Sequence, residues 1–575
     1  MSYPLDEAKK DITSLLKKSL SSLKYDCEIK LEHPPEGLGD FAFPCFPLAS
    51  IAKKSPKDIA EEIAKQIKKD KLVEKIEAKG AYVNFYLDKN KLKTLTLKTV
   101  FEKKDKYGYL EKKNKKVIIE HTSANPNGPL HVGRARNPII GDTIVRIFKA
   151  AGYDVESQFY LDDMGKQVAI LGWGVNNLYQ KKIPKTKYKK PDHQTVWFYQ
   201  EASKLLEKDK KVDDEISNIV KKSEEGDQKI ISLIHKAYSP VLEGINESLR
   251  RINITIDKYV PESKFVEDKS VDKVVEKLKK SKYCGIEDDA YFLDMEPFGV
   301  QGRNTKFFFL RKDGTTLYAT RDVAYHMWKA EHADKLINIL GEDHKLESKQ
   351  VEIALNLVNI KKIPKVIFYS FVTLPGGKMS TRQARVVYLD ELIDECIKRA
   401  YDEVKKRREH ELSEQKMREI AEIIGIGALR YNIIKVQPEK DIVFKWEDAL
   451  NFEGNSCPFI QYSHARACSI LSKNKDDLEG FNAELLKHNS EIDLIKKIAN
   501  FPDVIDDSCE CYKPHSITLY LFDVASSFNQ FYRDCPVLPE KNKDVRKARL
   551  ALVDATRIVI KNGLNLFGIV APEEM

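Results

Sequence analysis

The chain has 575 residues, of which 42% are hydrophobic and 32% are charged. These proportions exclude a disordered or fibrous protein, and at about 150 residues per domain the length predicts several domains. Lys and Arg number 97 against 88 Asp and Glu, so the formal charge is +9. This excess is compatible with an RNA partner but cannot establish one, because a solvated surface rich in Lys and Glu accounts for most of it.

The nine cysteines are scattered, and an odd number without regular spacing argues against a disulfide framework. Cys509 and Cys511 form a tight pair near His515, but no second pair stands at zinc-ligand spacing, so no metal site is predicted. The N-terminus carries no secretion signal, and no apolar run is long enough to span a bilayer. We therefore expect a cytoplasmic protein with no membrane partner.

Residues 1–110 are expected to form a small α/β accessory domain. Residues 5–23 and 56–69 have helical periodicity, and residues 80–87 alternate like a strand. A Gly/Pro-rich turn containing Gly39-Asp40-Phe41-Ala42 lies between them. No catalytic constellation is visible in this domain.

Residues 115–390 are expected to form the catalytic domain. Strands and helices alternate along it, which predicts a Rossmann-like doubly wound parallel sheet with its ligand at the carboxyl ends of the strands. A Lys-rich stretch of about 175–285 shows no strand pattern and is interpreted as an inserted helical segment. The strands after the first are expected at residues 155–160, 315–318, 335–340 and 366–372.

The first strand of this domain leads into the stretch around which the chain is organised. An apolar run ends at Glu120, a Pro/Gly/Asn turn follows, and a helix is predicted over 135–152. His131, Gly133 and Arg134 stand where that helix begins, and anions bind well at such a helix start. Gly133 lets a planar base approach the backbone. A surface helix start with polar residues would explain these side chains too.

A second loop follows the last predicted strand and reads Gly376-Gly377-Lys378-Met379-Ser380-Thr381-Arg382. Two glycines before a cation and a hydroxyl suit close contact with a polyphosphate. Residues 391–575 are helical in pattern and predict an all-α bundle. The helices expected there cover 389–407, 420–431, 461–471, 517–531 and 543–565.

Together, the two loops resemble the signature motifs of class I aminoacyl-tRNA synthetases. Several stretches resemble the arginyl-tRNA synthetase family in particular, and the likeness extends nearly from end to end. These stretches are residues 120–133, 257–263, 318–325 and 561–572, together with the Gly39–Ala42 turn of the N-terminal domain. The resemblance implies ligation of L-arginine to its tRNA through arginyl-adenylate, with ATP and Mg²⁺. It also implies that tRNA is needed for the first step, that 391–575 bind the anticodon and that 1–110 bind tRNA.

The resemblance implies roles for individual residues. Arginine contacts fall on Glu120, Asn125, Glu262, Tyr318, Asp322 and His344. ATP contacts fall on His131, Gly133, Lys378, Met379 and Ser380, and the catalytic set is His131, Gly133, Arg134, Lys378 and Ser380. Paired carboxylates suit a guanidinium, which is planar and has five donors. Helix capping or a surface ion pair would explain Glu120 or Asp322 taken alone.

The chain departs from the family pattern at a few positions. Arg134 replaces the second histidine of the first motif, Thr381 replaces the second lysine of the other, and His344 stands where many relatives have a glutamine. Two alternatives stay open. Another class I synthetase is disfavoured by the missing zinc-ligand spacing and by the carboxylate set, and a non-catalytic RNA-binding relative is disfavoured by the intact motif residues. We expect the chain to act as a monomer.

Overall fold

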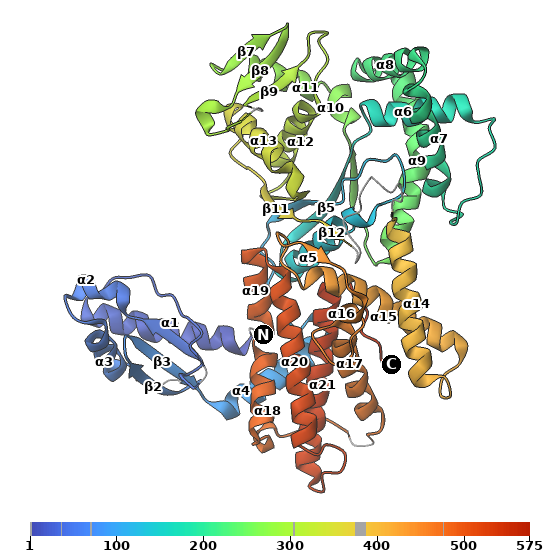
Figure 1. The fold of residues 1–575 in the computed structure, drawn as a ribbon. Helices are drawn as coiled ribbons and strands as arrows, with labels where there is room; N and C mark the ends of the chain where they lie inside the picture. The colour runs from blue at the N-terminus through green and yellow to red at the C-terminus, as the bar shows by residue number, and fades with distance from the viewer. Residues whose placement is uncertain (1–2, 36, 69–71, 303–304, 374–386, 475–476) are drawn as a thin grey trace.

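The computed structural model describes residues 3–35, 37–68, 72–302, 305–373, 387–474 and 477–575. Figure 1 shows a small α/β domain beside a long bundle of helices, with the central sheet and its helical and β-sheet additions above that bundle. No helix among the described residues is long and apolar enough to cross a membrane.

The N-terminal domain is a three-stranded antiparallel sheet covered by helices, as expected. Its strands run in the order β1-β3-β2 and its core holds Ile12, Ile59 and Phe85, all fully buried. The elements are α1 (Pro4–Leu23), β1 (Phe41–Pro44), α2 (Ala49–Ala52), α3 (Pro56–Gln66), β2 (Val73–Lys79) and β3 (Tyr82–Leu87). Helix α4 (Lys89–Lys103) then leads into the rest of the molecule and packs on the helical bundle.

The central sheet confirms the predicted doubly wound parallel fold. Its five strands run parallel in the order β11-β10-β4-β5-β6. They are β4 (Lys116–Glu120), β5 (Asp154–Leu161), β6 (Lys258–Pro261), β10 (Lys335–Gly341) and β11 (Lys365–Tyr369). The chain adds β5 and β6 on one side of β4 and later adds β10 and β11 on the other side. The strand order therefore reverses between β4 and β10. In open α/β sheets this reversal point is where ligands bind.

Two expectations about strands are wrong. The stretch 175–285 contains β6, whose four residues pair with β5 inside the central sheet. A strand of four residues is too short to show a periodic pattern within a Lys-rich stretch of sequence. Residues 315–318 are not a strand, because Tyr318 begins a helix; the strand before it, β9 (Lys306–Leu310), lies in a separate antiparallel sheet with β7 (Cys284–Glu287) and β8 (Ala290–Asp294).

Helices fill the connections between the strands of the central sheet. Helix α5 (Arg136–Ala150) links β4 to β5, and α13 (Lys345–Leu357) links β10 to β11. Between β5 and β6 run α6 (Lys166–Leu178), α7 (Pro191–Leu206), α8 (Lys210–Glu224) and α9 (Gln228–Arg251). Between β6 and β10 run α10 (Ser263–Glu267), α11 (Ser270–Lys279) and α12 (Tyr318–His332).

The C-terminal part is helical apart from a two-residue strand, β13 (Ile442–Val443), which pairs with β12 (Val372–Thr373). Its helices are α14 (Leu389–Arg408), α15 (Glu414–Ile434), α16 (Trp446–Ala449), α17 (Cys457–Ser472), α18 (Asn489–Ala499), α19 (Phe501–Cys511), α20 (Pro514–Asp534) and α21 (Lys543–Leu566). The long helices α20 and α21 lie side by side in the bundle (Figure 1). One large core continues from this bundle into the central sheet.

Candidate active site

The turn after β4 begins at the reversal point of the sheet. Glu120 is the last residue of β4 and pairs in register with Asn338 on β10. The next residues bend sharply, with left-handed φ values of +73° at Thr122 and +35° at Ser123. Such values are costly for residues with a side chain and cluster at functional turns. The sharp bend leads the chain toward His131.

His121 and Gly141 decide how closely α5 packs on this turn. His121 is fully buried, and a Cβ built on Gly141 would lie 2.3 Å from the His121 Cβ. Only glycine therefore fits at this point of α5. Burial also lowers the pKa of His121 to about 4, so the imidazole is neutral at physiological pH.

Glu120 belongs to a chain of buried polar contacts between β4 and α12. Lys329 Nζ lies 2.6 Å from Glu120 Oε2, 3.0 Å from Asn338 Oδ1 and 3.3 Å from His326 Nε2. The other ring nitrogen of His326, Nδ1, lies 3.0 Å from Asp322 Oδ1. Two of the predicted arginine contacts, Glu120 and Asp322, are thus joined through Lys329 and His326.

Asp322 and Tyr318 lie one turn apart near the start of α12. Burial opposes ionisation of Asp322, but His326 and Lys329 outweigh it and hold its pKa below the usual value. The charge of His344 acts in the same direction. Tyr318 is 56% exposed, so much of its side chain faces solvent one helical turn before Asp322.

A group of carboxylates lies at the ends of β5 and β6, next to Arg321 of α12. Glu262 is 2% exposed, and its Oε1 lies 2.9 Å from Arg321 Nε. Tyr160 Oη is buried and has no hydrogen-bond partner among the described residues, whereas the Glu262 carboxylate is hydrogen-bonded to the neighbouring carboxyl group of Asp162. Burial and the Glu262 charge raise the pKa of Asp162 well above its usual value. Unpartnered buried polar atoms are rare in folded proteins, so Tyr160 Oη suggests a polar ligand beside these carboxylates.

The turn carrying His131 has a single 3₁₀ turn over Val132–Arg134 before α5 begins. His131 and Arg134 are exposed and Gly133 is half-buried. Partial desolvation and the Arg134 charge lower the pKa of His131, which favours a neutral imidazole. The Arg134 charge also acts on His344, whose pKa is raised chiefly by its hydrogen bond to Glu347. The predicted ATP contact Arg134 therefore lies near the predicted arginine contact His344.

Two groups of predicted residues stand apart. Asn125 is half-buried, and its amide nitrogen donates to Gln167 Oε1 at 2.8 Å. Lys378, Met379 and Ser380, like Thr381 and Arg382, lie outside the described residues.

Sequence reasoning missed several polar residues that complete this site. Asp322, His326 and Lys329 follow each other at helical spacing, so their common face was a readable signal. Tyr160 and Arg321 gave no such signal, because one lies in a strand of mixed polar and apolar residues and the other among ordinary helix residues. The residues missed are Tyr160, Asp162, Arg321, His326, Lys329 and Asn338.

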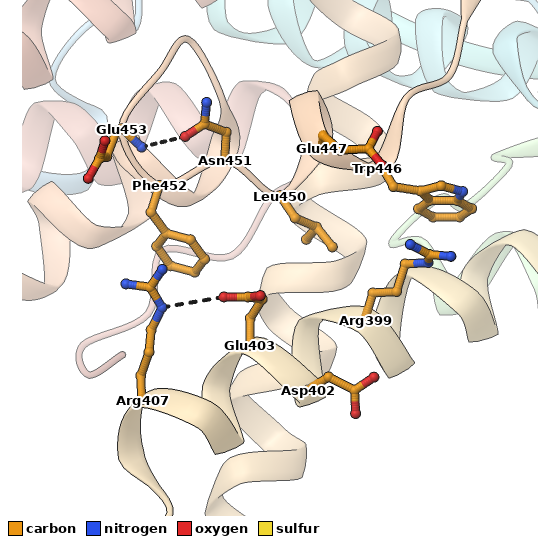
Figure 2. A pocket seen from close by; sticks show the side chains of 10 residues that line it. All are labelled: Arg399, Asp402, Glu403, Arg407, Trp446, Glu447, Leu450, Asn451, Phe452 and Glu453. Carbon is orange, nitrogen blue, oxygen red and sulfur yellow. Dashed lines mark hydrogen bonds and ion pairs between the residues drawn. The ribbon is translucent and has the colours of Figure 1, made fainter. Parts of the chain in front are cut away.

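A separate pocket of about 480 Å³ lies in the helical part, between α14 and residues 446–453. Figure 2 shows the Arg399 guanidinium against the Trp446 ring and the Arg407 guanidinium against the Phe452 ring. The two guanidinium carbons lie 4.6 Å and 4.5 Å from the ring centroids. One face of each ring is thereby covered by the protein itself, and none of the predicted site residues lines this pocket.

Three parts of the chain match known protein families. Residues 96–446 match the family described as tRNA synthetases class I (R), catalytic domain. Residues 7–87 match the Arginyl tRNA synthetase N terminal domain, and residues 460–575 match the DALR anticodon binding domain.

Full-length relatives and solved structures agree with these matches. The chain is 47% identical to the arginine–tRNA ligase of Methanocella arvoryzae over 92% of both chains. It is 42% identical to that of Methanothermobacter thermautotrophicus over 100% of both. The arginyl-tRNA synthetase structure from Thermus thermophilus superposes with a TM-score of 0.83 at 26% identity, covering 98% of this chain and 100% of that one. The chain therefore belongs to the arginyl-tRNA synthetase family of the class I aminoacyl-tRNA synthetases.

Proposed function

We propose that this chain joins L-arginine to its tRNA in two steps. Arginine and ATP first form arginyl-adenylate and pyrophosphate, and a hydroxyl of the terminal ribose of the tRNA then takes the arginyl group with release of AMP. The observation that carries the proposal is the group of carboxylates on Asp162, Glu262 and Asp322 at the strand ends and at the start of α12, in a chain of this family. A planar cation with several N–H donors is the ligand that such a group of carboxylates suits best.

Glu262, Asp322 and Tyr318 are the proposed guanidinium contacts. Arg321 contacts Glu262 Oε1 and Asp162 hydrogen-bonds to the same carboxylate, so the substrate is proposed to share Glu262 with these two side chains. Asp322 is kept ionised by His326, and the exposed Tyr318 ring lies one helical turn away. A lysine ammonium cannot present two parallel N–H groups to a carboxylate, so the same carboxylates discriminate against lysine.

Glu120, Asn125 and His344 are proposed to hold the backbone end of the arginine. Glu120 lies at the end of β4, next to the turn that carries His131. Its ion pair with the fully buried Lys329 keeps it in place as a carboxylate. An amino acid held at Glu120 by its ammonium group would present its carboxylate toward the nucleotide. That orientation suits direct attack on the α-phosphorus of ATP.

His131, Gly133 and Arg134 are proposed to contact ATP, with Lys378, Met379 and Ser380 from the second loop. His131 and Arg134 stand before α5, where backbone N–H groups and the helix dipole favour phosphate. Mg²⁺ is proposed to enter bound to the ATP phosphates, as part of the substrate. Preorganised cations at the phosphates stabilise the charge that develops as pyrophosphate leaves.

The helical part, residues 391–575, is proposed to bind the anticodon loop, and residues 1–110 are proposed to bind the tRNA body. Tyr462 and Tyr532 are each 42% exposed, and the Arg466 guanidinium carbon lies 4.8 Å and 5.5 Å from their ring centroids. Exposed rings beside an arginine suit stacking with unpaired bases. We predict that the chain acts as a monomer.

The test is arginine-dependent exchange between ATP and pyrophosphate, measured with and without tRNA from a related organism. We expect exchange with L-arginine and tRNA, and none with lysine or citrulline, which lack the guanidinium. Exchange with lysine in place of arginine would contradict the specificity. No exchange with any of the standard amino acids, even with tRNA, would contradict the enzymatic function.

A further inference from the structure

A buried polar cluster lies where the first turns of α7 and α14 meet α9. Its centre is Asp390, which is 1% exposed. Lys190 Nζ lies 2.7 Å from Asp390 Oδ2, and His193 Nε2 lies 3.1 Å from the same oxygen. Ser248 Oγ donates to Asp390 at 3.1 Å, and Arg251 Nη1 lies 3.1 Å from Asp390 Oδ1. One carboxylate thus receives four donors from two other helices and the residue before one of them.

Three side chains of the cluster could in principle coordinate a metal ion, but the ammonium group of Lys190 already lies between their carboxylates. One ligand atom each from Asp192, His193 and Asp390 lie within 4.8 Å of one another. The Lys190 ammonium lies 2.7 Å from Asp390 and 3.5 Å from Asp192. Helix α9 approaches so closely that a Cβ on Gly244 would lie 2.3 Å from the Asp192 Cγ. The cluster is therefore a packed ionic joint between helices.

Main-chain hydrogen bonds connect this joint to the turn that carries His131. Val132 N donates to Val387 O at 3.0 Å, and Leu389 N donates to Leu130 O at 2.7 Å. His131 itself pairs with Tyr388 as an isolated β-bridge. Asp390 directly follows Leu389. The turn that carries His131 is therefore hydrogen-bonded to the segment 387–389, which the buried cluster around Asp390 fixes in place.

Ring contacts run along the same path. The Tyr388 ring centroid lies 5.6 Å from that of His131 on one side and 5.0 Å from that of His193 on the other. His193 in turn bonds to Asp390. Tyr388 is therefore held between a proposed ATP contact and a member of the cluster.

We infer that Asp390 is a positioning residue for the ATP-binding turn, acting through Tyr388 and the backbone of residues 387–389. This rests on the proposed role of His131 in binding ATP. The donors outweigh the cost of burial and hold the Asp390 pKa well below its usual value, so the joint stays charged at neutral pH. A displacement of about 1 Å at a reacting group can lower its rate by orders of magnitude, so a loosened joint is expected to show in ATP use.

The experiment compares Asp390→Asn with Asp394→Asn in the full chain. Asp394 also pairs with Arg251, at 2.6 Å, but it is 39% exposed and lies one turn further from Tyr388. Equilibrium dialysis with MgATP measures the Kd, exchange kinetics measure the KM for ATP and for arginine, and thermal melting reports folding. We expect Asp390→Asn to weaken ATP binding by about tenfold with an unchanged arginine KM, and Asp394→Asn to change neither by more than about twofold.

A double variant separates positioning from folding. Asp390→Asn alone leaves the buried Lys190 ammonium with only the 3.5 Å contact to Asp192, whereas Lys190→Met with Asp390→Asn removes both members of the 2.7 Å pair. The double variant is expected to regain only part of the melting temperature, because the buried Asp192 has then lost its ammonium partner. We expect ATP binding to stay weak in this double variant, because the hydrogen bonds that the Asp390 carboxylate accepts from Lys190, His193 and Arg251 are not restored. An ATP Kd within twofold of the wild-type value in both variants would overturn the inference. It would also be overturned if the affinities for ATP and for arginine fell equally and in proportion to the fall in melting temperature. If the wild type binds ATP but activates a different amino acid, the proposed function fails and this inference stands.

Discussion

Lys329 Nζ lies 2.6 Å from Glu120 Oε2, and the two side chains are 0% and 5% exposed. The pair joins α12 to the end of β4 at the reversal point of the sheet. An ion pair this deep holds its geometry well, but losing one partner leaves a buried charge without compensation.

Lys329→Met is therefore expected to lower the free energy of unfolding by about 3 to 5 kcal/mol, the usual cost of breaking a buried pair. The double variant with Glu120→Gln should regain most of that stability because no charge is left unpaired. The KM of this double variant for arginine should be higher than that of the wild type, because the Glu120 carboxylate is missing. Thermal melting and exchange kinetics give the two readouts. A double variant with normal arginine KM would show that Glu120 serves the fold alone.

Asp322→Asn is expected to raise the KM for arginine by at least about tenfold, because a hydrogen bond to a charged group contributes about 1.5 to 3 kcal/mol. The ATP KM should change little. Asp268→Asn is the matched control, since Asp268 pairs with Lys264 on α10 at the surface. If the arginine KM of the Asp322 variant stays within twofold of the control, Asp322 does not hold the guanidinium.

The stability of the fold should depend on pH through His121. Its pKa is lowered to about 4 by burial, whereas an exposed imidazole titrates near pH 6.5. Below pH 6.5 the unfolded chain binds a proton that the folded chain refuses, so stability is complete above pH 6.5 and is lost as pH falls toward 4.

Between pH 7 and pH 5 the contribution of His121 to this loss is about 2 kcal/mol. His121→Asn should therefore lose less melting temperature over that interval than the wild type does. Melting curves at several pH values of constant ionic strength check this. Parallel pH profiles for the two proteins would show that His121 is not the group responsible.

Gly141→Ala should destabilise the fold and slow the enzyme. The added Cβ would lie 2.3 Å from the His121 Cβ, so α5 must move away from β4, and overpacking of this kind costs about 1 to 3 kcal/mol. Gly172→Ala on α6 is the control, because its Cβ would meet Leu233 Cδ2 at 3.1 Å, the end of a flexible side chain. Melting temperature and exchange rate should fall in the first variant only. Equal effects would mean that helix α5 has room for alanine.

Much of the fold was predictable from local pattern. The strand ending at Glu120, the helix after it and the helices of the C-terminal part were readable because long periodic segments report which face is buried. The strand β6 was not readable, since four residues between charged segments carry no period, and neither was the antiparallel sheet β7-β8-β9.

By itself, the sequence determined the parallel α/β fold, the family and the residue types at the candidate site, because motifs and periodicity are local properties of a chain. Only the tertiary structure decided which buried charges meet. Lys329 and Glu120 are 209 residues apart, and Asp390 and Lys190 are 200 apart. No local signal links such distant positions. Their pairing follows from which strands and helices pack together, and from the need of each buried charge for a partner in a medium without water.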